Sequence, residues 1–219
     1  MNVTEEQVAA GQAVYTKLVL RAYDLVVLGV SNRFIWKCPT QRLLEHYNLH
    51  VSANHADVGV GTGYFLDKCR FPSSTPRIAL IDLNQNTLDF ASRRIARYKP
   101  TTYRRSVLDP ICIDEPKFDS VGFNYLLHCL PGSIASKSVA LDRVKALMNA
   151  NAVFFGATLL QGGVRRTRLA KRLMHLYNKK GIFSNEADDL DRLSTELRKR
   201  FTDVSLEVVG CAALFAGRA

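Results

Sequence analysis

The sequence contains no uninterrupted run of 18 apolar residues, so it offers no candidate for a membrane-spanning helix. Its first residues, MNVTEEQ, lack the basic segment of a secretory signal peptide. The five cysteines are scattered, odd in number and without a C-x-x-C pair, which argues against a disulfide framework and against a cysteine-based zinc site. These absences predict a cytoplasmic protein without a membrane span.

Acidic residues are few relative to basic ones, and 30 Lys and Arg against 20 Asp and Glu give a net charge of +10. A basic balance of this kind is one signature of proteins that bind nucleic acid. The cations, however, gather on predicted helix faces and near predicted helix ends, where the helix dipole favours positive charge. The sequence therefore argues for solvated basic helix faces and against nucleic acid as a partner.

The order of apolar segments predicts an α/β fold. With 219 residues, of which 47% are hydrophobic, the chain is long enough for one domain with a sizeable core. Strands and helices alternate, which is typical of an open, mostly parallel sheet. We expect helices over 5–22, 39–50, 87–98, 134–148, 165–180 and from Ser184 or Asn185 to Arg200, strands over 56–60, 152–158, 204–208 and 211–216, and irregular chain over Gly29–Lys37.

The segment DVGVGTG at 57–63 follows a short apolar stretch and leads into a predicted helix. Glycine permits positive φ angles and lets a ligand approach the backbone without meeting a Cβ atom. The helix that follows presents free N–H groups near such a ligand. This segment predicts a nucleotide-binding turn, and an ordinary glycine-rich β-turn is the alternative.

Three further polar residues come at or just after the ends of predicted strands. Asp82 ends the segment IALID about 20 residues after Gly63, the distance expected for a carboxylate that accepts hydrogen bonds from a ribose. Asp109 follows SVL, and Asn124 ends FDSVGFN. Because ligands of open α/β sheets bind at the carboxyl ends of the strands, we expect these side chains in one site. For Asp82 the alternative is a position at the N-terminal end of the next helix, which Asn84 or Asn86 could cap, and both roles can hold together.

These segments, in this order and spacing, resemble the class I S-adenosylmethionine-dependent methyltransferases, and most of all the compact small-molecule branch that includes the ubiquinone-type enzymes. VGVGTG resembles their first motif, LIDLN their second, VLDP their adenine-contacting segment and FDSVGFNYLLHCLPG their fourth. The resemblance, over about residues 50–217, implies a Rossmann-like fold. Its seven-stranded, mostly parallel sheet would end in an antiparallel C-terminal hairpin and carry helices on both faces. It further implies one domain over 1–219, with an N-terminal helical lid over 1–50 and a core over 51–219.

The same resemblance implies S-adenosylmethionine as the cofactor, with its methionine end at the glycine turn and its ribose at the second motif. The residues expected to bind it are Asp57, Gly59, Gly61, Gly63, Asp82, Leu83, Leu108, Asp109 and Asn124.

The acceptor side of the site is predicted from position alone. His128 follows the fourth strand and is the candidate general base for a hydroxyl acceptor, because an ordinary histidine titrates near neutral pH. A packed or capping histidine is the alternative. The residues expected to wall the acceptor site or cover the cofactor are Tyr15, Tyr23, Arg33, Trp36, Tyr177, Phe183 and Asn185. The alternative for Arg33 is a surface arginine, and the alternative for Trp36 is a core tryptophan.

The predicted function is methyl transfer to a small, hydrophobic metabolite through oxygen, nitrogen or sulfur, in secondary metabolism. An RNA methyltransferase and a non-methylating protein that binds S-adenosylmethionine are the alternatives. His46 and His50 are spaced as two metal ligands on a helix, but no third ligand is evident, so no metal site is predicted. The sequence leaves the oligomeric state open between monomer and homodimer.

Overall fold

We describe the protein from a computed structural model that covers residues 24–113 and 116–219, apart from the side chains of residues 25–27. The helix expected over 5–22, and with it the predicted site residues Tyr15 and Tyr23, lies outside the described residues. Within these ranges, no helix is long and apolar enough to cross a membrane.

Seven strands form one sheet in the order β3-β2-β1-β4-β5-β7-β6. The first five strands are parallel, and β7 runs antiparallel to both β5 and β6. The predicted seven-stranded sheet with an antiparallel C-terminal hairpin is therefore confirmed. The strands are β1 (Asn54–Val58), β2 (Arg77–Asp82), β3 (Thr101–Arg104), β4 (Phe118–Asn124), β5 (Met148–Leu159), β6 (Thr202–Val209) and β7 (Ala212–Arg218).

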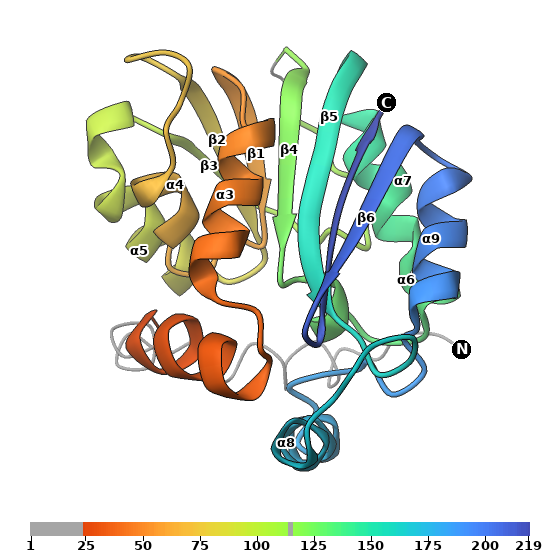
Figure 1. The fold of residues 1–219 in the computed structure, drawn as a ribbon. Helices are drawn as coiled ribbons and strands as arrows, with labels where there is room; N and C mark the ends of the chain where they lie inside the picture. Colours follow the sequence, from red (N-terminus) through yellow and green to blue (C-terminus); the bar gives the residue numbers. More distant parts are fainter. Residues whose placement is uncertain (1–23, 114–115) are drawn as a thin grey trace.

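Helices cover both faces of this sheet, with α3, α4 and α5 on one face and α6, α7 and α9 on the other (Figure 1). The segment η1 and helix α8 lie at the end of the sheet toward which β4 points (Figure 1). The helical segments are η1 (Asp24–Ile35), α3 (Thr40–His50), α4 (Tyr64–Lys68), α5 (Gln85–Arg94), η2 (Ala96–Tyr98), η3 (Leu127–Cys129), α6 (Ile134–Lys137), α7 (Val139–Ala146), α8 (Arg168–Lys179) and α9 (Leu190–Arg198).

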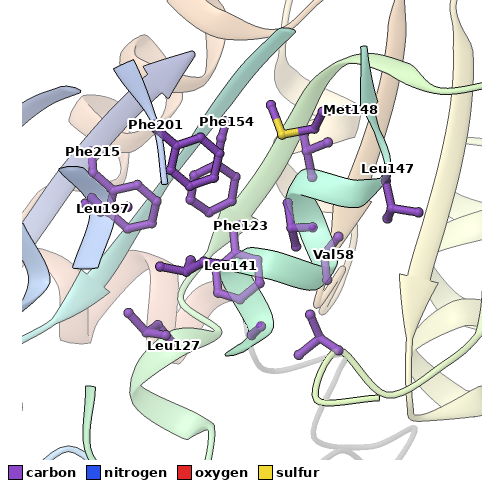
Figure 2. Close-up of a cluster of buried hydrophobic side chains, with 14 of the residues drawn as sticks. Val58, Phe123, Leu127, Leu141, Leu147, Met148, Phe154, Leu197, Phe201 and Phe215 are labelled. Atoms are coloured by element: carbon purple, nitrogen blue, oxygen red, sulfur yellow. The ribbon is translucent and has the colours of Figure 1, made fainter. Parts of the chain in front are cut away.

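The strands divide their side chains between two cores because successive residues of a strand point to opposite faces. Ala79 and Ile81 belong to the core under α7 and α9, whereas Ile78 and Leu80 belong to the core under α3 and α5. Figure 2 shows the first of these cores, in which residues of β4, β5 and β7 meet α7 and α9. Both faces of the parallel strands are covered, as expected for strands of nearly continuous apolar sequence.

Three expectations about local structure were wrong. Gly29–Lys37 is not irregular throughout, because most of it lies in η1. The third strand is β3, rich in Thr and Tyr, and the segment Ser106–Asp109 that we expected to be a strand is a turn after it. The last helix begins after Asp189, whose side chain accepts a hydrogen bond from the Arg192 backbone at 2.8 Å.

The expected lid over residues 1–50 stays a prediction as a whole, because 1–23 lie outside the described residues, but its last helix does not stand over the cleft. Helix α3 packs against the sheet and buries Leu43 and Tyr47 completely, so it is part of a helix layer. The segment η1, which precedes α3, lies at the carboxyl end of the sheet (Figure 1).

Candidate active site

A cleft opens at the carboxyl ends of β1, β2 and β4. The strand order reverses here: β2 and β3 follow β1 to one side, while β4 and β5 extend to the other. Such a switch point is where open α/β sheets bind their ligands. The cleft is lined by the glycine turn, by the residues after β2 and β3, and by the segment from Asn124 to Pro131.

The glycine turn leaves room for a ligand against the backbone. Gly59 has a φ angle of +74°, and a Cβ atom there would stand 2.8 Å from the Leu126 side chain. Gly61 also has a positive φ, of +52°, and no atom lies within 4 Å of the position of its missing Cβ. Side chains at both positions would be strained, and only at Gly61 does open space face the backbone. The turn therefore has the accessible backbone that a nucleotide-type ligand needs.

Two carboxylates, Asp57 and Asp82, line the cleft at the ends of β1 and β2. Oδ1 of Asp82 accepts a hydrogen bond from the Asn84 backbone at 2.8 Å, and burial raises the pKa of Asp82 to about 6. Oδ2 of Asp57 accepts a hydrogen bond from the hydroxyl of Tyr47 at 2.7 Å. The alternative role of Asp82 at the start of the next helix is compatible with a ligand role, because Asn84 caps α5 and Asp82 accepts its hydrogen bond from the backbone of that same residue.

Asn124 ends β4 in the same cleft. Its Nδ2 atom is buried and has no hydrogen-bond partner among the described residues. An unpaired buried amide is costly, so this donor favours a ligand with an acceptor group at this point. Leu83 and Leu108 also line the cleft, whereas Asp109 is exposed and does not. Eight of the nine expected cofactor residues are thus brought together in one cleft.

The segment η1 is tied to the glycine turn by polar contacts that the sequence did not indicate. Asp24 accepts a hydrogen bond from the Thr62 hydroxyl at 2.6 Å and pairs with Arg94 of α5 at 2.5 Å. Leu28 of η1 lines the cleft. Arg94 has only 20% of its side chain exposed, so it is not one of the solvated cations that the basic helix faces predicted. These contacts hold η1 across one side of the cleft.

His128 lies behind the cleft rather than in it. Its ring is 3% exposed, and His128 is absent from the residues that line the cleft. Nδ1 accepts a hydrogen bond from the Leu159 backbone N–H at 3.3 Å, so the neutral ring carries its proton on Nε2. Burial, with a contribution from the charge of Lys137, lowers the pKa of His128 to about 3. This geometry favours the packed alternative, and the general-base role stays a prediction.

The aromatic residues expected at the acceptor site gather around Phe183, whose ring packs on His128. The Phe183 ring lies 4.6 Å from the His128 ring, 5.0 Å from Tyr177 and 6.2 Å from Trp36, measured between centroids. None of these four residues lines the cleft. They pack η1 and α8 onto the ends of β5 and β7, and Tyr125 and Cys129 separate them from the cleft.

Asn185 and Arg33, the remaining residues expected at the acceptor site, also lie outside the cleft lining. Asn185 is fully buried, donates to the carbonyl of Leu159 at 3.0 Å and pairs with Asn178. Arg33 is exposed and stacks over Phe34, with 5.6 Å between the guanidinium carbon and the ring centroid. Arg33 therefore takes the alternative of a surface arginine, and Asn185 has a packing role in this structure.

The same region holds a buried ion pair that the sequence analysis missed. Lys137 and Asp188 have no exposed side-chain surface, and Nζ lies 2.6 Å from Oδ2. Lys137 also donates to the carbonyl of Ser184 at 2.7 Å. This pair fastens the segment before α9 onto α6. Nothing in the local pattern distinguishes Lys137 from the solvated lysines of other helices.

Tyr125 is a further lining residue without a sequence signal. It follows β4 with a φ angle of +57°, which is rare outside glycine and is concentrated at functional sites. Its backbone N–H donates to the carbonyl of Ala157 at 2.8 Å, which holds this conformation. No group of three metal-ligating side chains occurs within the described ranges.

Comparison with known proteins assigns the family. Residues 56–154 match the family described as methyltransferase domain. Demethylluteothin O-methyltransferase of Streptomyces thioluteus is 40% identical, over 98% of this chain and 93% of that protein. The physcion biosynthesis cluster O-methyltransferase of Aspergillus chevalieri is 36% identical, over 94% of this chain and 93% of that protein.

Among solved structures, the N-methyltransferase NodS of Bradyrhizobium japonicum WM9, in complex with S-adenosylhomocysteine, superimposes with a TM-score of 0.64. It is 14% identical and the match covers 98% of each chain, so it shows a shared fold. Fold, cleft and relatives together define a Rossmann-like methyl-transferring enzyme. The chain belongs to the class I S-adenosylmethionine-dependent methyltransferases. S-adenosylmethionine is its cofactor, and the accessible backbone at Gly61 and the unpaired amide of Asn124 fit a ligand with polar acceptor groups.

Proposed function

We propose that this enzyme methylates a hydroxyl oxygen of a small, largely apolar metabolite. The observation that carries the proposal is that the wall of the cleft beyond Asp57 and Asp82 is apolar. Its apolar side chains come from η1, from the turn after β3 and from the segment after β4: Leu28, Val107, Leu126, Leu130 and Pro131. Apolar walls of this kind bind apolar ligands, while a few polar groups fix their orientation.

At the cofactor end, Asp57 would accept hydrogen bonds from the amino group and Asp82 from the ribose hydroxyls. Asn124 would donate from Nδ2 to an acceptor of the cofactor. When bound, S-adenosylmethionine supplies an electrophilic methyl group on a positively charged sulfur. The contribution of the chain is to hold the acceptor oxygen in line with that group, and proximity of this kind accounts for much of the rate.

The described lining of the cleft contains no histidine, and Cys129 in its wall keeps its own proton near neutral pH because burial raises its thiol pKa to about 12, so it cannot accept one from the substrate. We therefore propose an acceptor that is itself acidic, such as a phenol or an enol, which loses its proton without a dedicated base. The relatives named as O-methyltransferases of small molecules support oxygen as the acceptor atom.

The test is to incubate the enzyme with S-adenosylmethionine carrying a ¹³C-labelled methyl group and a panel of phenols, thiols and amines of similar size. We expect a methoxy carbon signal with phenols or enols. Methylation confined to the thiols or amines would contradict the oxygen assignment. Methylation of RNA in a parallel reaction, lost at high salt, would favour the nucleic-acid alternative.

A further inference from the structure

A chain of buried polar side chains runs from the cleft into the interior beneath helix α3. His55 and Asp57 are two residues apart on β1 and point to the same face, toward α3. The hydroxyl of Tyr47, on α3, meets both: it donates to Oδ2 of Asp57 at 2.7 Å and lies 2.8 Å from Nε2 of His55. Tyr47 and His55 are fully buried, and Asp57 is 6% exposed.

The donor and the acceptor of each hydrogen bond in this row of side chains follow from the group at its Asp57 end. An ionised carboxylate only accepts, so the single hydroxyl proton of Tyr47 points to Asp57. Burial and the neighbouring Asp57 raise the pKa of Tyr47 well above its ordinary value, so this proton stays in place. The hydroxyl can then only accept from His55, whose Nε2 must carry a proton.

The far side of the His55 ring is fixed as well. Nδ1 lies 2.8 Å from the hydroxyl oxygen of Ser120, which stands opposite His55 on β4. The Ser120 oxygen in turn accepts a hydrogen bond from the Ser52 backbone at 2.9 Å. Both ring nitrogens therefore have partners, and the ring cannot rotate without breaking two contacts.

The surroundings of this chain are apolar and tightly fitted. Phe65 stacks on Tyr47 with 5.7 Å between centroids, and Phe155 meets the Tyr47 ring edge-on at 5.0 Å. Opposite Asp57 on β4 stands Gly122, where a Cβ atom would lie 3.0 Å from Oδ2 of Asp57 and 3.2 Å from Cε1 of His55. Hydrogen bonds in such a dry site are stronger and more directional than in water.

We propose that Tyr47 and His55 are positioning residues that aim the Asp57 carboxylate at the amino group of the cofactor. The proposal rests on the role of Asp57 given under the proposed function. Tyr47 occupies Oδ2 and fixes the plane of the carboxylate, and His55 fixes the hydroxyl of Tyr47. Neither residue lines the cleft, so neither contacts the ligand itself.

The test compares two ligands by calorimetry on the full chain. S-adenosylhomocysteine carries the amino and carboxyl groups, whereas 5′-methylthioadenosine has the same nucleoside and thioether without them. Tyr47→Phe keeps the ring packing and removes the hydroxyl. We expect its affinity for S-adenosylhomocysteine to fall about 10-fold, the scale of one hydrogen bond to a charged group, while its affinity for methylthioadenosine stays within about twofold.

The matched control is Tyr98→Phe. The Tyr98 ring packs against Phe71 in the same core, but its hydroxyl takes no part in the hydrogen bonds among Tyr47, His55 and Asp57. This control should leave both affinities unchanged. A Tyr47→Phe protein that binds S-adenosylhomocysteine with full affinity would overturn the proposal. An equal loss for both ligands would also overturn it, because that result indicates general damage to the fold.

Two further variants separate the assumptions. Asp57→Asn should weaken binding of S-adenosylhomocysteine alone, and if it does not, the role of Asp57 fails whatever Tyr47 does. His55→Leu should behave like Tyr47→Phe, whereas His55→Gln, which keeps an N–H donor, should retain most of the affinity. If Asp57→Asn weakens binding but Tyr47→Phe and His55→Leu do not, the positioning role fails and that of Asp57 stands.

Discussion

At the scale of single residues, the two carboxylates of the cleft differ in what holds them. Asp57 has a buried hydroxyl donor, whereas Asp82 is held mainly by backbone N–H groups and has a pKa raised to about 6 by burial. An aspartate in water titrates near 4, so Asp82 changes its charge within a range that is easily reached in the laboratory.

We therefore expect cofactor affinity to depend on pH through Asp82. A carboxylate accepts from two ribose hydroxyls, and its protonated form accepts less well. Calorimetry with S-adenosylhomocysteine should show binding weaker by about 10-fold at about pH 5 than at about pH 7.5. Asp82→Ala should weaken binding by about 1–3 kcal/mol and flatten this pH dependence. A wild-type profile that stays level down to pH 5 would contradict the ribose role.

The raised pKa of Asp82 has the opposite pH effect on the stability of the ligand-free protein. Because the pKa of Asp82 is higher in the folded chain than in the unfolded one, the folded state holds its proton to a higher pH. The contribution of this group to stability therefore falls as pH rises from about 4 to about 6.

A variant of His128 distinguishes a catalytic role of this residue from a role in packing alone. Because Nδ1 accepts from the Leu159 backbone, we expect His128→Gln to lower the free energy of unfolding while leaving kcat within about 10-fold. Denaturant unfolding and turnover at saturating acceptor measure the two effects separately. A kcat reduced by about 10²–10⁴-fold in a protein of unchanged stability would restore the general-base role.

At the scale of elements, helix α8 and the residues just before it carry the basic sequence that raised the question of nucleic acid. Arg166 is half-buried and bonded to Gln161, so it is unsuitable for a test of surface charge. Arg165, Arg168 and Arg172 are exposed. Reversing these three to Glu should leave methylation of the small acceptor within about twofold, because these charges are solvated and none of them lines the cleft. A large loss of activity that salt also produces in the wild type would indicate an anionic substrate.

The buried pair of Lys137 and Asp188 decides how firmly the segment before α9 is held. Lys137→Met should destabilise the protein by about 3–5 kcal/mol, because it leaves Asp188 buried without its partner. Adding Asp188→Leu should recover part of that loss, which a double-mutant cycle in urea would measure. If the single and the double variants are equally unstable, the pair contributes by packing alone.

The sequence predicted elements wherever a pattern is local. The glycine turn, the strand before Asp82 and the alternation of β6 are readable in a few residues, and each lies close to its predicted position. Tyr47 and His55 were missed because they are joined through α3 and β1, although the two-residue spacing of His55 and Asp57 was visible. Tyr177 and Phe183 were expected at the acceptor site, but their position depends on how α8 packs, which no local pattern encodes.

At the scale of the whole molecule, the cleft joins segments from distant parts of the chain, so a ligand there bridges several elements. We expect S-adenosylhomocysteine at about 100 times its dissociation constant to stabilise the folded state by about 2.7 kcal/mol. For a domain of this size, that corresponds to a rise in melting temperature of roughly 5–10 °C. Calorimetric scans measure this shift. Adenosine at the same concentration lacks the amino-acid end and should give a smaller shift, whereas the absence of any shift with S-adenosylhomocysteine would contradict a binding site built by the folded chain.

The place of β7 in the sheet has a consequence for how the chain is made. It lies between β5 and β6, although both of those strands come before it in the sequence. During synthesis, β5 and β6 therefore wait with unpaired edges until β7 leaves the ribosome and inserts between them. Since Phe154 and Phe215 meet across this junction, one of the two cores is also incomplete until then. The sheet is therefore completed only when β7 has been made. If translation stops before β7, the released chain has a sheet with unpaired strand edges.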